Sequence, residues 1–512
     1  MPDRSPIAAD RAGRKGIPTL IHALGDAVQH CPEQTAMVCD GTQASYQEFG
    51  QAVARIAAKV ESLGLGKGDR VGIAVGQSVE LLQLIYGVMA SGAQATMFNP
   101  MYTAREYEPL LEISQPKLIF CDAVSNGAIK SASKERQITL LDLSTGPEIW
   151  LEPGTPDFPP NLPQPEDMAM LLFTGGTTGR PKAVPHTHGA IRASVEISDG
   201  RWHTNLDQEV FLTIPPLFHI AGLMMGCFWP VYCRSKVVLL PRFHPELVFD
   251  AIIQHAPTIF AAGIPTVYTA LLHHAEFDNQ DFSGLRFTTG GGAPLPAAML
   301  REWEERTGVI VLEGYGMSEG VPFCDNPLKG VRKPGSVGLP VAGTEVEIVD
   351  VETGQKVMPV GETGEIRVKG AQVATGYIND PEATTTAFRD GWLYTGDIAY
   401  QDEDGYYFIV DRVKDMAIVS GYNVYPREID ELLAAHPAIS EAAAVGVPDD
   451  YRGEIVRAYV VVKEDQELTA EQLLDYCREN LVHYKVPGEV VITTDLPKTP
   501  VGKIDKKQLR IK

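Results

Sequence analysis

Residues 174–182 read Thr-Gly-Gly-Thr-Thr-Gly-Arg-Pro-Lys and directly follow a short apolar run at 169–173. Glycines let backbone N–H groups approach an anion closely, the threonines add hydroxyl donors, and Lys182 adds a fixed positive charge. A simple flexible turn would need neither the hydroxyls nor the lysine. The stretch therefore predicts a phosphate-holding loop after a buried strand. It is not the P-loop of kinases, because Arg180 and Pro181 separate its last glycine from the lysine.

Short apolar runs alternate with helical patterns on both sides of this loop. We expect a helix at 79–90 and strands at 70–75, 93–98, 117–121, 169–173, 237–240, 258–261 and 285–289. Alternation of this kind predicts largely parallel α/β layers. The strand–helix–strand theme occurs at 70–98 and again at 210–240, which suggests two α/β subdomains.

The sequence pattern changes after about residue 335, from alternating strands and helices to strands alone. We expect strands at 345–349, 365–369, 392–394 and 406–410, and the close turn signals between them predict a small β-barrel or twisted sheet over 335–410. The last hundred residues predict a small α+β domain with helices at 426–435 and 470–481. The expected organisation is a flexible arm at 1–20, a large domain at 21–410, a hinge at 411–415 and a C-terminal domain at 416–512.

Charge and composition exclude several classes of protein. The 512 residues include 44 basic and 66 acidic side chains, a formal net charge of −22. This balance argues against nucleic-acid binding and against a polybasic membrane anchor. The seven cysteines are scattered and form no CxxC pair, so neither a disulfide scaffold nor a zinc ribbon is expected.

Two segments bear on location. The N-terminus is charged and lacks the apolar core of a secretory signal. Residues 210–233 carry no formal charge but contain Pro215, Pro216 and Pro230, so we expect a buried, broken segment rather than a membrane span. A cytoplasmic protein with reduced thiols and no transmembrane segment is the expectation.

Further motifs follow the loop in order along the chain. They are Pro215-Pro216-Leu217-Phe218-His219, Gly290-Gly291-Gly292-Ala293-Pro294, Gly314-Tyr315-Gly316-Met317-Ser318-Glu319, Tyr394-Thr395-Gly396-Asp397, Asp411-Arg412-Val413-Lys414-Asp415, Ser420-Gly421-Tyr422-Asn423-Val424-Tyr425-Pro426 and Pro497-Lys498-Thr499-Pro500-Val501-Gly502-Lys503. Together with the loop they resemble the signatures of the adenylate-forming superfamily, which includes acyl-CoA synthetases, aryl-CoA ligases, luciferases and peptide-synthetase adenylation domains. The segment at 312–319 and the C-terminal half look most like bacterial fatty acid–CoA ligases.

The resemblance implies an ATP site. Its nucleotide-binding residues would be Thr174, Gly175, Gly176, Thr177, Thr178, Gly179, Gly291, Gly292, Ala293, Pro294, Gly314, Tyr315, Gly316, Met317, Ser318, Asp397 and Arg412. Asp397 is suited to accept both ribose hydroxyls, and Glu319 to hold Mg²⁺ through oxygen, with Thr174 beside it. Core packing for Tyr315 and a structural ion pair for Arg412 are the alternatives.

Catalysis is expected to centre on Lys503, with Lys182 and Glu319. An ammonium between the attacking carboxylate and the α-phosphate stabilises the charge that develops in the transition state. By resemblance, the C-terminal domain turns about Lys414 between two half-reactions. One pose presents Lys503, and the other presents Ser420, Gly421 and Tyr422 to coenzyme A.

The substrate is less defined. An acyl pocket is expected around His219, Phe218, Leu223, Gly316 and Gly291. Gly316 stands where acetate-activating relatives carry tryptophan, which favours a deeper pocket and a medium- or long-chain fatty acid. His186 and His188 could be read as metal ligands, but no Cys/His cluster accompanies them, so solvated or supporting histidines are expected.

Other functions stay open. A benzoate- or coumarate-type CoA ligase shares nearly every motif, and an acyl-adenylate former could use another acceptor. A nucleotide-binding regulator with a dead site is the non-enzyme alternative, which the retained catalytic residues argue against. The expected small molecules are a carboxylic acid, ATP, Mg²⁺ and coenzyme A. The sequence leaves a homodimer open.

Overall fold

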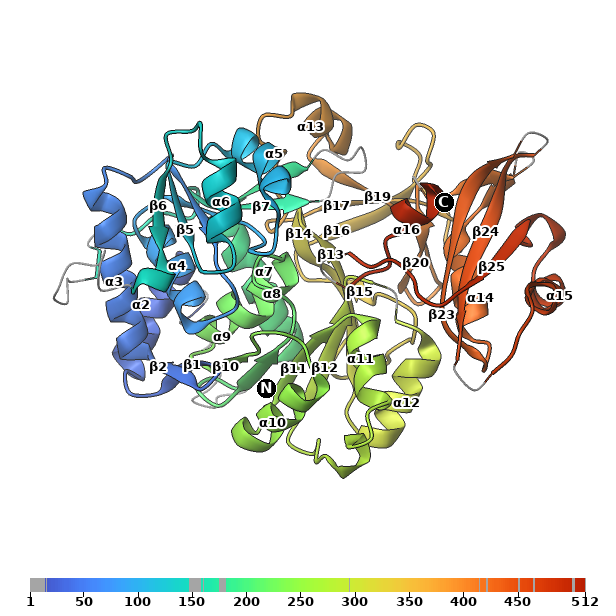
Figure 1. The fold of residues 1–512 in the computed structure, drawn as a ribbon, viewed down its shortest axis with the longest axis horizontal. Helices are drawn as coiled ribbons and strands as arrows, with labels where there is room; N and C mark the ends of the chain where they lie inside the picture. The colour runs from blue at the N-terminus through green and yellow to red at the C-terminus, as the bar shows by residue number, and fades with distance from the viewer. Residues whose placement is uncertain are drawn as a thin grey trace.

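The part of the chain that the structure describes is built of four β-sheets and the helices that cover them (Figure 1). The computed structural model describes residues 14, 16–146, 158–159, 161–174, 181–293, 295–413, 415–419, 422–449, 452–463, 466–499 and 502–511. Within these residues the helices are α2 (Leu20–His30), α3 (Tyr46–Ser62), α4 (Val79–Ala90), α5 (Ala104–Ser114), α6 (Asn126–Ala132), α7 (His188–Trp202), α8 (Ile220–Leu223), α9 (Trp229–Tyr232), α10 (Pro245–His255), α11 (Pro265–Leu272), α12 (Ala297–Thr307), α13 (Pro381–Ala387), α14 (Pro426–Ala434), α15 (Ala470–Asn480) and α16 (Lys506–Ile511), with short turns η1 (Leu143–Thr145), η4 (Phe277–Asn279) and η5 (His483–Lys485) and the π-helical turn η3 (Met224–Phe228).

A six-stranded sheet carries the phosphate-loop motif at one edge. Its order is β6-β5-β3-β4-β7-β8, and all its pairs are parallel except β7 with β8. The strands are β3 (Arg70–Ala74), β4 (Gln94–Met97), β5 (Leu118–Cys121), β6 (Thr139–Asp142), β7 (Met168–Thr174) and β8 (Lys182–Thr187).

A nine-stranded sheet lies on the opposite side of the central helices from the six-stranded sheet. Its order is β15-β14-β13-β12-β11-β9-β10-β1-β2. The strands are β1 (Thr35–Cys39), β2 (Thr42–Ser45), β9 (Val210–Thr213), β10 (Lys236–Leu239), β11 (Ile259–Gly263), β12 (Phe287–Gly291), β13 (Val311–Met317), β14 (Gly320–Asp325) and β15 (Leu339–Pro340). The predicted strands of both sheets are confirmed to within two residues at each end.

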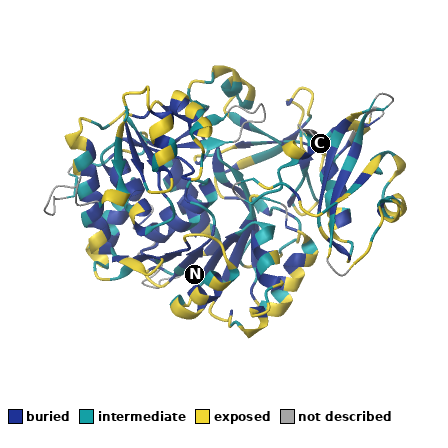
Figure 2. Cartoon of the chain, in the orientation of Figure 1, coloured by how far each residue is buried: buried dark blue, intermediate teal, exposed yellow. Residues whose placement is uncertain are grey.

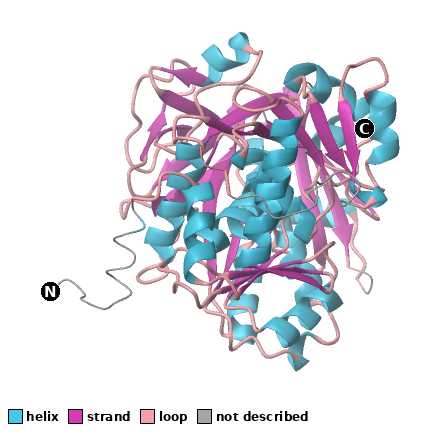
Figure 3. Ribbon diagram, turned by 90° about the vertical axis from the view of Figure 1, so that its left-hand side faces the viewer, coloured by secondary structure: helices cyan, strands magenta, loops and turns pink. Residues whose placement is uncertain are grey.

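The main core lies between these two sheets. It joins inward residues such as Ile73 and Phe211 to helices α2, α3, α4, α7 and α9. The alternate residue Leu212 faces the other way, toward α10, α11 and α12, as the two-residue period of a strand requires. Figure 3 shows helices stacked between the strands, and Figure 2 shows that exposed residues gather on the outer helices. Helices α5 and α6 pack on the other face of the six-stranded sheet, so both of these largely parallel sheets are covered on both faces.

Local signals fix several helix ends. The Ser78 hydroxyl accepts from the Leu81 N–H, and α4 begins at the next residue, as predicted. Ser45 and Glu48 form a reciprocal capping box at the start of α3.

The uncharged segment at 210–233 is a broken core element, as predicted. It contains β9, α8, η3 and α9, and most of its side chains are buried. In the part of the chain that the structure describes, no helix is long and apolar enough to cross a membrane.

The third sheet is antiparallel and follows residue 344. Its order is β16-β17-β19-β18, with β20 also paired to β19. The strands are β16 (Glu345–Val349), β17 (Gly364–Lys369), β18 (Phe388–Arg389), β19 (Trp392–Gln401) and β20 (Tyr407–Arg412). Strand β19 runs well past the three residues predicted, because it continues through a bulge described below.

The fourth sheet belongs to the C-terminal part, at the right of Figure 1. Its order is β22-β21-β24-β23, with β25 paired to β24. The strands are β21 (Ala417–Val419), β22 (Tyr422–Val424), β23 (Ile439–Asp449), β24 (Gly453–Val462) and β25 (Glu489–Thr493), covered by α14 and α15. The final helix α16 returns to residues near the predicted hinge, where Arg510 pairs with Asp415 at 2.7 Å.

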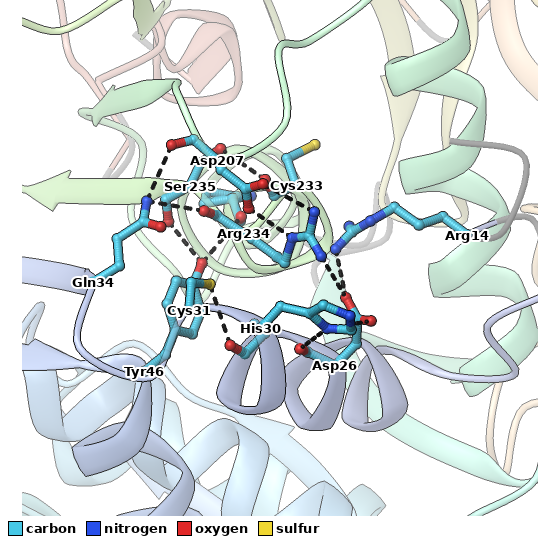
Figure 4. A network of polar contacts seen from close by, with 12 residues as sticks. Arg14, Asp26, His30, Cys31, Gln34, Tyr46, Asp207, Cys233, Arg234 and Ser235 are labelled. Atoms are coloured by element: carbon cyan, nitrogen blue, oxygen red, sulfur yellow. Dashed lines mark hydrogen bonds and ion pairs between the residues drawn. The ribbon is translucent and has the colours of Figure 1, made fainter. Parts of the chain in front are cut away.

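The packed structure begins before residue 21. Arg14 is buried and pairs with Asp26 Oδ2 at 2.7 Å, and Arg234 Nη1 lies 3.7 Å from the same oxygen (Figure 4). Arg234 also binds Asp207, with Nε 2.6 Å from the carboxylate. This ion-pair network ties part of the predicted arm to α2 and to the segment before β9 and β10.

Candidate active site

Two antiparallel strands hold the ends of the phosphate-loop motif together. Thr174 ends β7 and lies opposite Lys182, which begins β8. Several predicted site residues fall outside the residues that the structure describes, and their roles stay predictions: Gly175, Gly176, Thr177, Thr178, Gly179, Pro294, Lys414, Ser420 and Gly421.

Glu319 lies beside Lys182 at the tight turn between β13 and β14. Its side chain is buried, and the Tyr377 hydroxyl donates to Glu319 Oε1 at 2.6 Å. The Lys182 ammonium lies 4.8 Å from the centre of the Tyr377 ring. Burial raises the pKa of Glu319, while the Tyr377 hydroxyl and the charge of Lys182 oppose that rise.

A histidine supports the same turn from β8. His186 Nε2 lies 2.8 Å from the Ser318 carbonyl oxygen, and burial lowers the pKa of His186 to about 4. The ring is therefore neutral near pH 7 and donates to the carbonyl. His186 and His188 are both buried, so of the two alternatives expected for these rings the solvated one is wrong, and His186 is a supporting residue. The described residues contain no cluster of three or more metal-ligating side chains.

Asp397 is presented by a bulge in β19. Residues 365 and 367 of β17 pair with 398 and 394 of β19, so Thr395, Gly396 and Asp397 stand opposite a single residue. Gly396 has φ +73°, which favours glycine, and its N–H donates to Glu365 Oε1 at 2.9 Å. Bulges re-aim side chains next to active sites.

The Asp397 carboxylate is held on both oxygens. Tyr315 Oη donates to Oδ2 at 2.5 Å, and Arg412 Nε lies 3.1 Å from Oδ1. The Tyr315 ring packs edge-on against Phe323, with centroids 5.7 Å apart. Both alternatives raised for these residues, packing by Tyr315 and an ion pair by Arg412, thus exist in this structure.

Lys503 reaches the same region from the C-terminal part. A Cβ atom on Gly292 would lie 3.6 Å from Lys503 Nζ, so the ammonium rests against the glycine loop. Gly502, with φ +78°, packs against Ile264. Burial lowers the pKa of Lys503 to about 8; the charge of Arg412 adds to this, and Asp397 opposes it.

Glycines keep the predicted nucleotide-binding residues at 291–293 close to β13. Gly291 of β12 pairs with Gly314 of β13, and a Cβ on Gly291 would meet the Gly314 carbonyl oxygen at 2.8 Å. A Cβ on Gly316 would meet Val321 Cγ2 at 2.6 Å. Ala293 is partly buried, and Met317 packs against the core of the third sheet.

His219 begins the apolar segment that was assigned to the acyl pocket. Its Nδ1 accepts from the Ala221 N–H at 3.3 Å, and burial, followed by the charge of Lys503, lowers the pKa of His219 to about 4. Leu223 is fully buried in the main core, and Phe218 packs against it. The pKa effect places His219 within electrostatic range of Lys503.

Tyr422 is separate from these groups. Its ring is exposed and stacks on Tyr484 with centroids 4.5 Å apart. Among the described residues, no hydrogen bond, ion pair or ring contact joins Tyr422 to Lys503 or Asp397.

Sequence reasoning missed two supporting residues, Tyr377 and Glu365, and it did not identify the partner of His186. The three residues contact their partners from 58, 31 and 132 residues away, so spacing along the chain gives no sign of these contacts. The Gly376-Tyr377 pair after β17 was the only local hint for Tyr377.

The chain also matches proteins of known family. Residues 24–378 match the family model described as AMP-binding enzyme, and residues 428–503 match the AMP-binding enzyme C-terminal domain. The chain is 36% identical to a long-chain-fatty-acid–CoA ligase of Bacillus subtilis, covering 96% of this chain and 94% of that protein. It is 35% identical to a feruloyl-CoA synthase of Amycolatopsis sp., covering 94% and 96%. The crystal structure of ATP-bound MatB from Rhodopseudomonas palustris superposes with a TM-score of 0.89 at 32% identity, covering 96% of this chain and 98% of that one.

Proposed function

Because this chain belongs to the AMP-binding enzyme family and is an AMP-forming acid–CoA ligase, we propose that its carboxylic acid substrate is a medium- or long-chain fatty acid. The observation that carries the proposal is the segment after His219. From Ile220 to Val231 it contains no charged side chain, and it is largely buried.

An apolar wall suits an alkyl chain. An arylpropenoate with a phenolic hydroxyl would leave that hydroxyl unpaired in such a wall, at a cost of about 1–3 kcal/mol. The segment also contains two consecutive methionines and the π-helical turn η3. Methionine side chains adapt to irregular apolar ligands, and π-turns are frequent at functional sites.

The first half-reaction joins the acid to AMP. A carboxylate oxygen of the acid attacks the α-phosphorus of ATP, and the bond to pyrophosphate breaks. We assign Lys503 to the negative charge that develops between these groups, Asp397 to the ribose hydroxyls and Lys182 to the phosphates. Their convergence around Gly292 and Glu319 supports this assignment.

The residues present fit a magnesium ion. Glu319 offers a buried carboxylate and Thr174 a hydroxyl, and oxygen is the ligand that Mg²⁺ prefers. Bound Mg²⁺ would neutralise part of the phosphate charge of ATP. The His219 ring, which is neutral near pH 7, would line the acyl pocket without adding charge.

The second half-reaction transfers the acyl group. The thiolate of coenzyme A attacks the acyl carbon, and the bond to AMP breaks. We propose that the C-terminal part turns about residue 414 and that Ser420, Gly421 and Tyr422 then face the thiol. The exposure of Tyr422 in the present pose supports a separate role for that face.

A feruloyl-type substrate is the second candidate, since a feruloyl-CoA synthase is as similar as the fatty-acid relatives. Pyrophosphate release with Mg-ATP distinguishes them when acetate, octanoate, palmitate, benzoate and coumarate are each tested with and without coenzyme A. We expect coenzyme A-dependent turnover on octanoate or palmitate. Turnover confined to benzoate or coumarate would refute the fatty-acid assignment, and release indifferent to coenzyme A would point to another acceptor.

A further inference from the structure

Tyr377 contacts two charged groups, Glu319 and Lys182. Its hydroxyl donates to Glu319 at 2.6 Å, and its ring carries the Lys182 ammonium at 4.8 Å from the centroid. The two contacts use different parts of one side chain. A single residue thus sets the separation between a carboxylate and an ammonium that come from different sheet hairpins.

The backbone around Tyr377 is held on both sides. The Tyr377 N–H donates to Thr384 Oγ1 at 2.9 Å, and the next N–H, of Ile378, donates to the Ala183 carbonyl at 2.9 Å. Ala183 follows Lys182 in β8. Three residues earlier, the Ala374 N–H donates to the Glu319 carbonyl at 2.7 Å. The segment at 374–378 therefore bridges the Glu319 turn and the start of β8.

This arrangement exceeds what packing requires. Tyr377 meets Phe388 edge-on, with ring centroids 5.5 Å apart, and a phenylalanine would keep that contact. Among the described residues, the hydroxyl adds the bond to Glu319. Without it, a buried carboxylate would lose a charge-assisted hydrogen bond that fixes its orientation.

We propose that Tyr377 is a positioning residue that holds Glu319 and Lys182 in one arrangement for metal-bound ATP. The hydroxyl aims the carboxylate at the metal, and the ring places the ammonium on the phosphates. This inference rests on the proposed function, because it takes Glu319 as the metal-holding carboxylate. Groups that orient metal ligands typically change metal affinity by about 10–100-fold when they are removed.

Two substitutions separate the two contacts. Tyr377→Phe removes the hydroxyl and keeps the ring, whereas Tyr377→Leu removes both. The matched control is Tyr400→Phe, because Tyr400 stacks on Phe408 in the third sheet, with ring centroids 5.0 Å apart. Binding is measured with a non-hydrolysable ATP analogue, first in EDTA by calorimetry and then with Mn²⁺ by electron paramagnetic resonance of the free ion.

We expect Tyr377→Phe to weaken Mn²⁺ binding to the enzyme–nucleotide complex about tenfold, while metal-free nucleotide binds within twofold of wild type. Tyr377→Leu should weaken both. A Tyr377→Phe enzyme with wild-type Mn²⁺ affinity would overturn the inference, because packing alone predicts full rescue by phenylalanine. Equal loss of metal-free nucleotide binding in both variants would also overturn it.

Two checks keep the outcome clear. If Tyr377→Phe lowers the melting temperature substantially, Thr384→Val gives an independent route, since it removes the acceptor for the Tyr377 N–H. It should weaken Mn²⁺ binding in the same direction, and no change would count against the inference. Failure of the wild-type enzyme to bind Mn²⁺ with nucleotide would instead contradict the proposed function.

Discussion

The Lys503 ammonium should be required for one half-reaction only. In this structure it lies against Gly292 and within range of His219, Arg412 and Asp397. Lys503→Ala removes the charge and leaves the strand pairs of the C-terminal sheet untouched, because residue 503 follows β25. We expect acyl-AMP formation to be lost and thioester formation from supplied acyl-AMP to continue.

The magnitude follows from the nature of the contact. A preorganised donor aimed at developing charge is worth about 2.7–4 kcal/mol, or roughly 100- to 1,000-fold in rate. Lys503 is partly buried, so after its truncation water compensates only part of the lost interaction with the developing negative charge. Adenylation should therefore fall by about that factor, whereas the melting temperature should stay close to wild type.

Each half-reaction has its own assay. Acid-dependent exchange of labelled pyrophosphate into ATP reports adenylation, and release of AMP from synthetic acyl-AMP plus coenzyme A reports the thiol step. Lys507→Ala is the matched control, since Lys507 is exposed on α16 four residues further along the chain. Equal losses in both assays for Lys503→Ala would refute the reasoning, as would a comparable adenylation loss in the control.

Three further outcomes are expected. The pKa of Lys503 is about 8, so kcat/KM for ATP in adenylation should fall about tenfold per pH unit above pH 8, because the neutral amine carries no charge. Lys503→Arg should remove this fall. A flat wild-type profile up to pH 9.5 would contradict the prediction. Asp397→Asn should raise the ATP dissociation constant, measured by calorimetry, by about tenfold or more, since it weakens the acceptor for ribose and for Tyr315; unchanged affinity would remove Asp397 from the nucleotide site. Asp26→Ala should lower the free energy of unfolding in urea by about 3 kcal/mol, because it leaves the buried Arg14 charge without its carboxylate, and a change below 1 kcal/mol would show that the network is dispensable.

Local chemistry made much of the fold predictable. Helix α4 begins after the Ser78 cap, and apolar runs between turn residues located the parallel strands, because these signals act within a few residues. Strand β19 was predicted too short because Gly396-Asp397 reads as a turn. Only its partner strands show that the chain bulges there and continues.

The geometry of the site could not be predicted from the sequence. The resemblance to the adenylate-forming superfamily points to Lys503, Asp397 and Glu319, whose roles stay predictions, yet which of them meet depends on contacts between distant segments. Tyr377 reaches Glu319 across 58 residues, and Lys503 meets a loop more than 200 residues earlier. Such contacts arise from packing of whole sheets, which no local pattern encodes.

The bulge in β19 also constrains the length of the chain there. Between the paired positions, two steps along β17 are matched by four along β19, so the surplus is an even number. Even parity keeps the side chains before and after the bulge on their own faces of the sheet, since facing alternates at every residue. Loss or gain of one residue at 395–397 would invert one half of the strand, turning Leu393 or Ala399 away from the core that they share. The motif should therefore tolerate some exchanges of residue but no single-residue deletion or insertion.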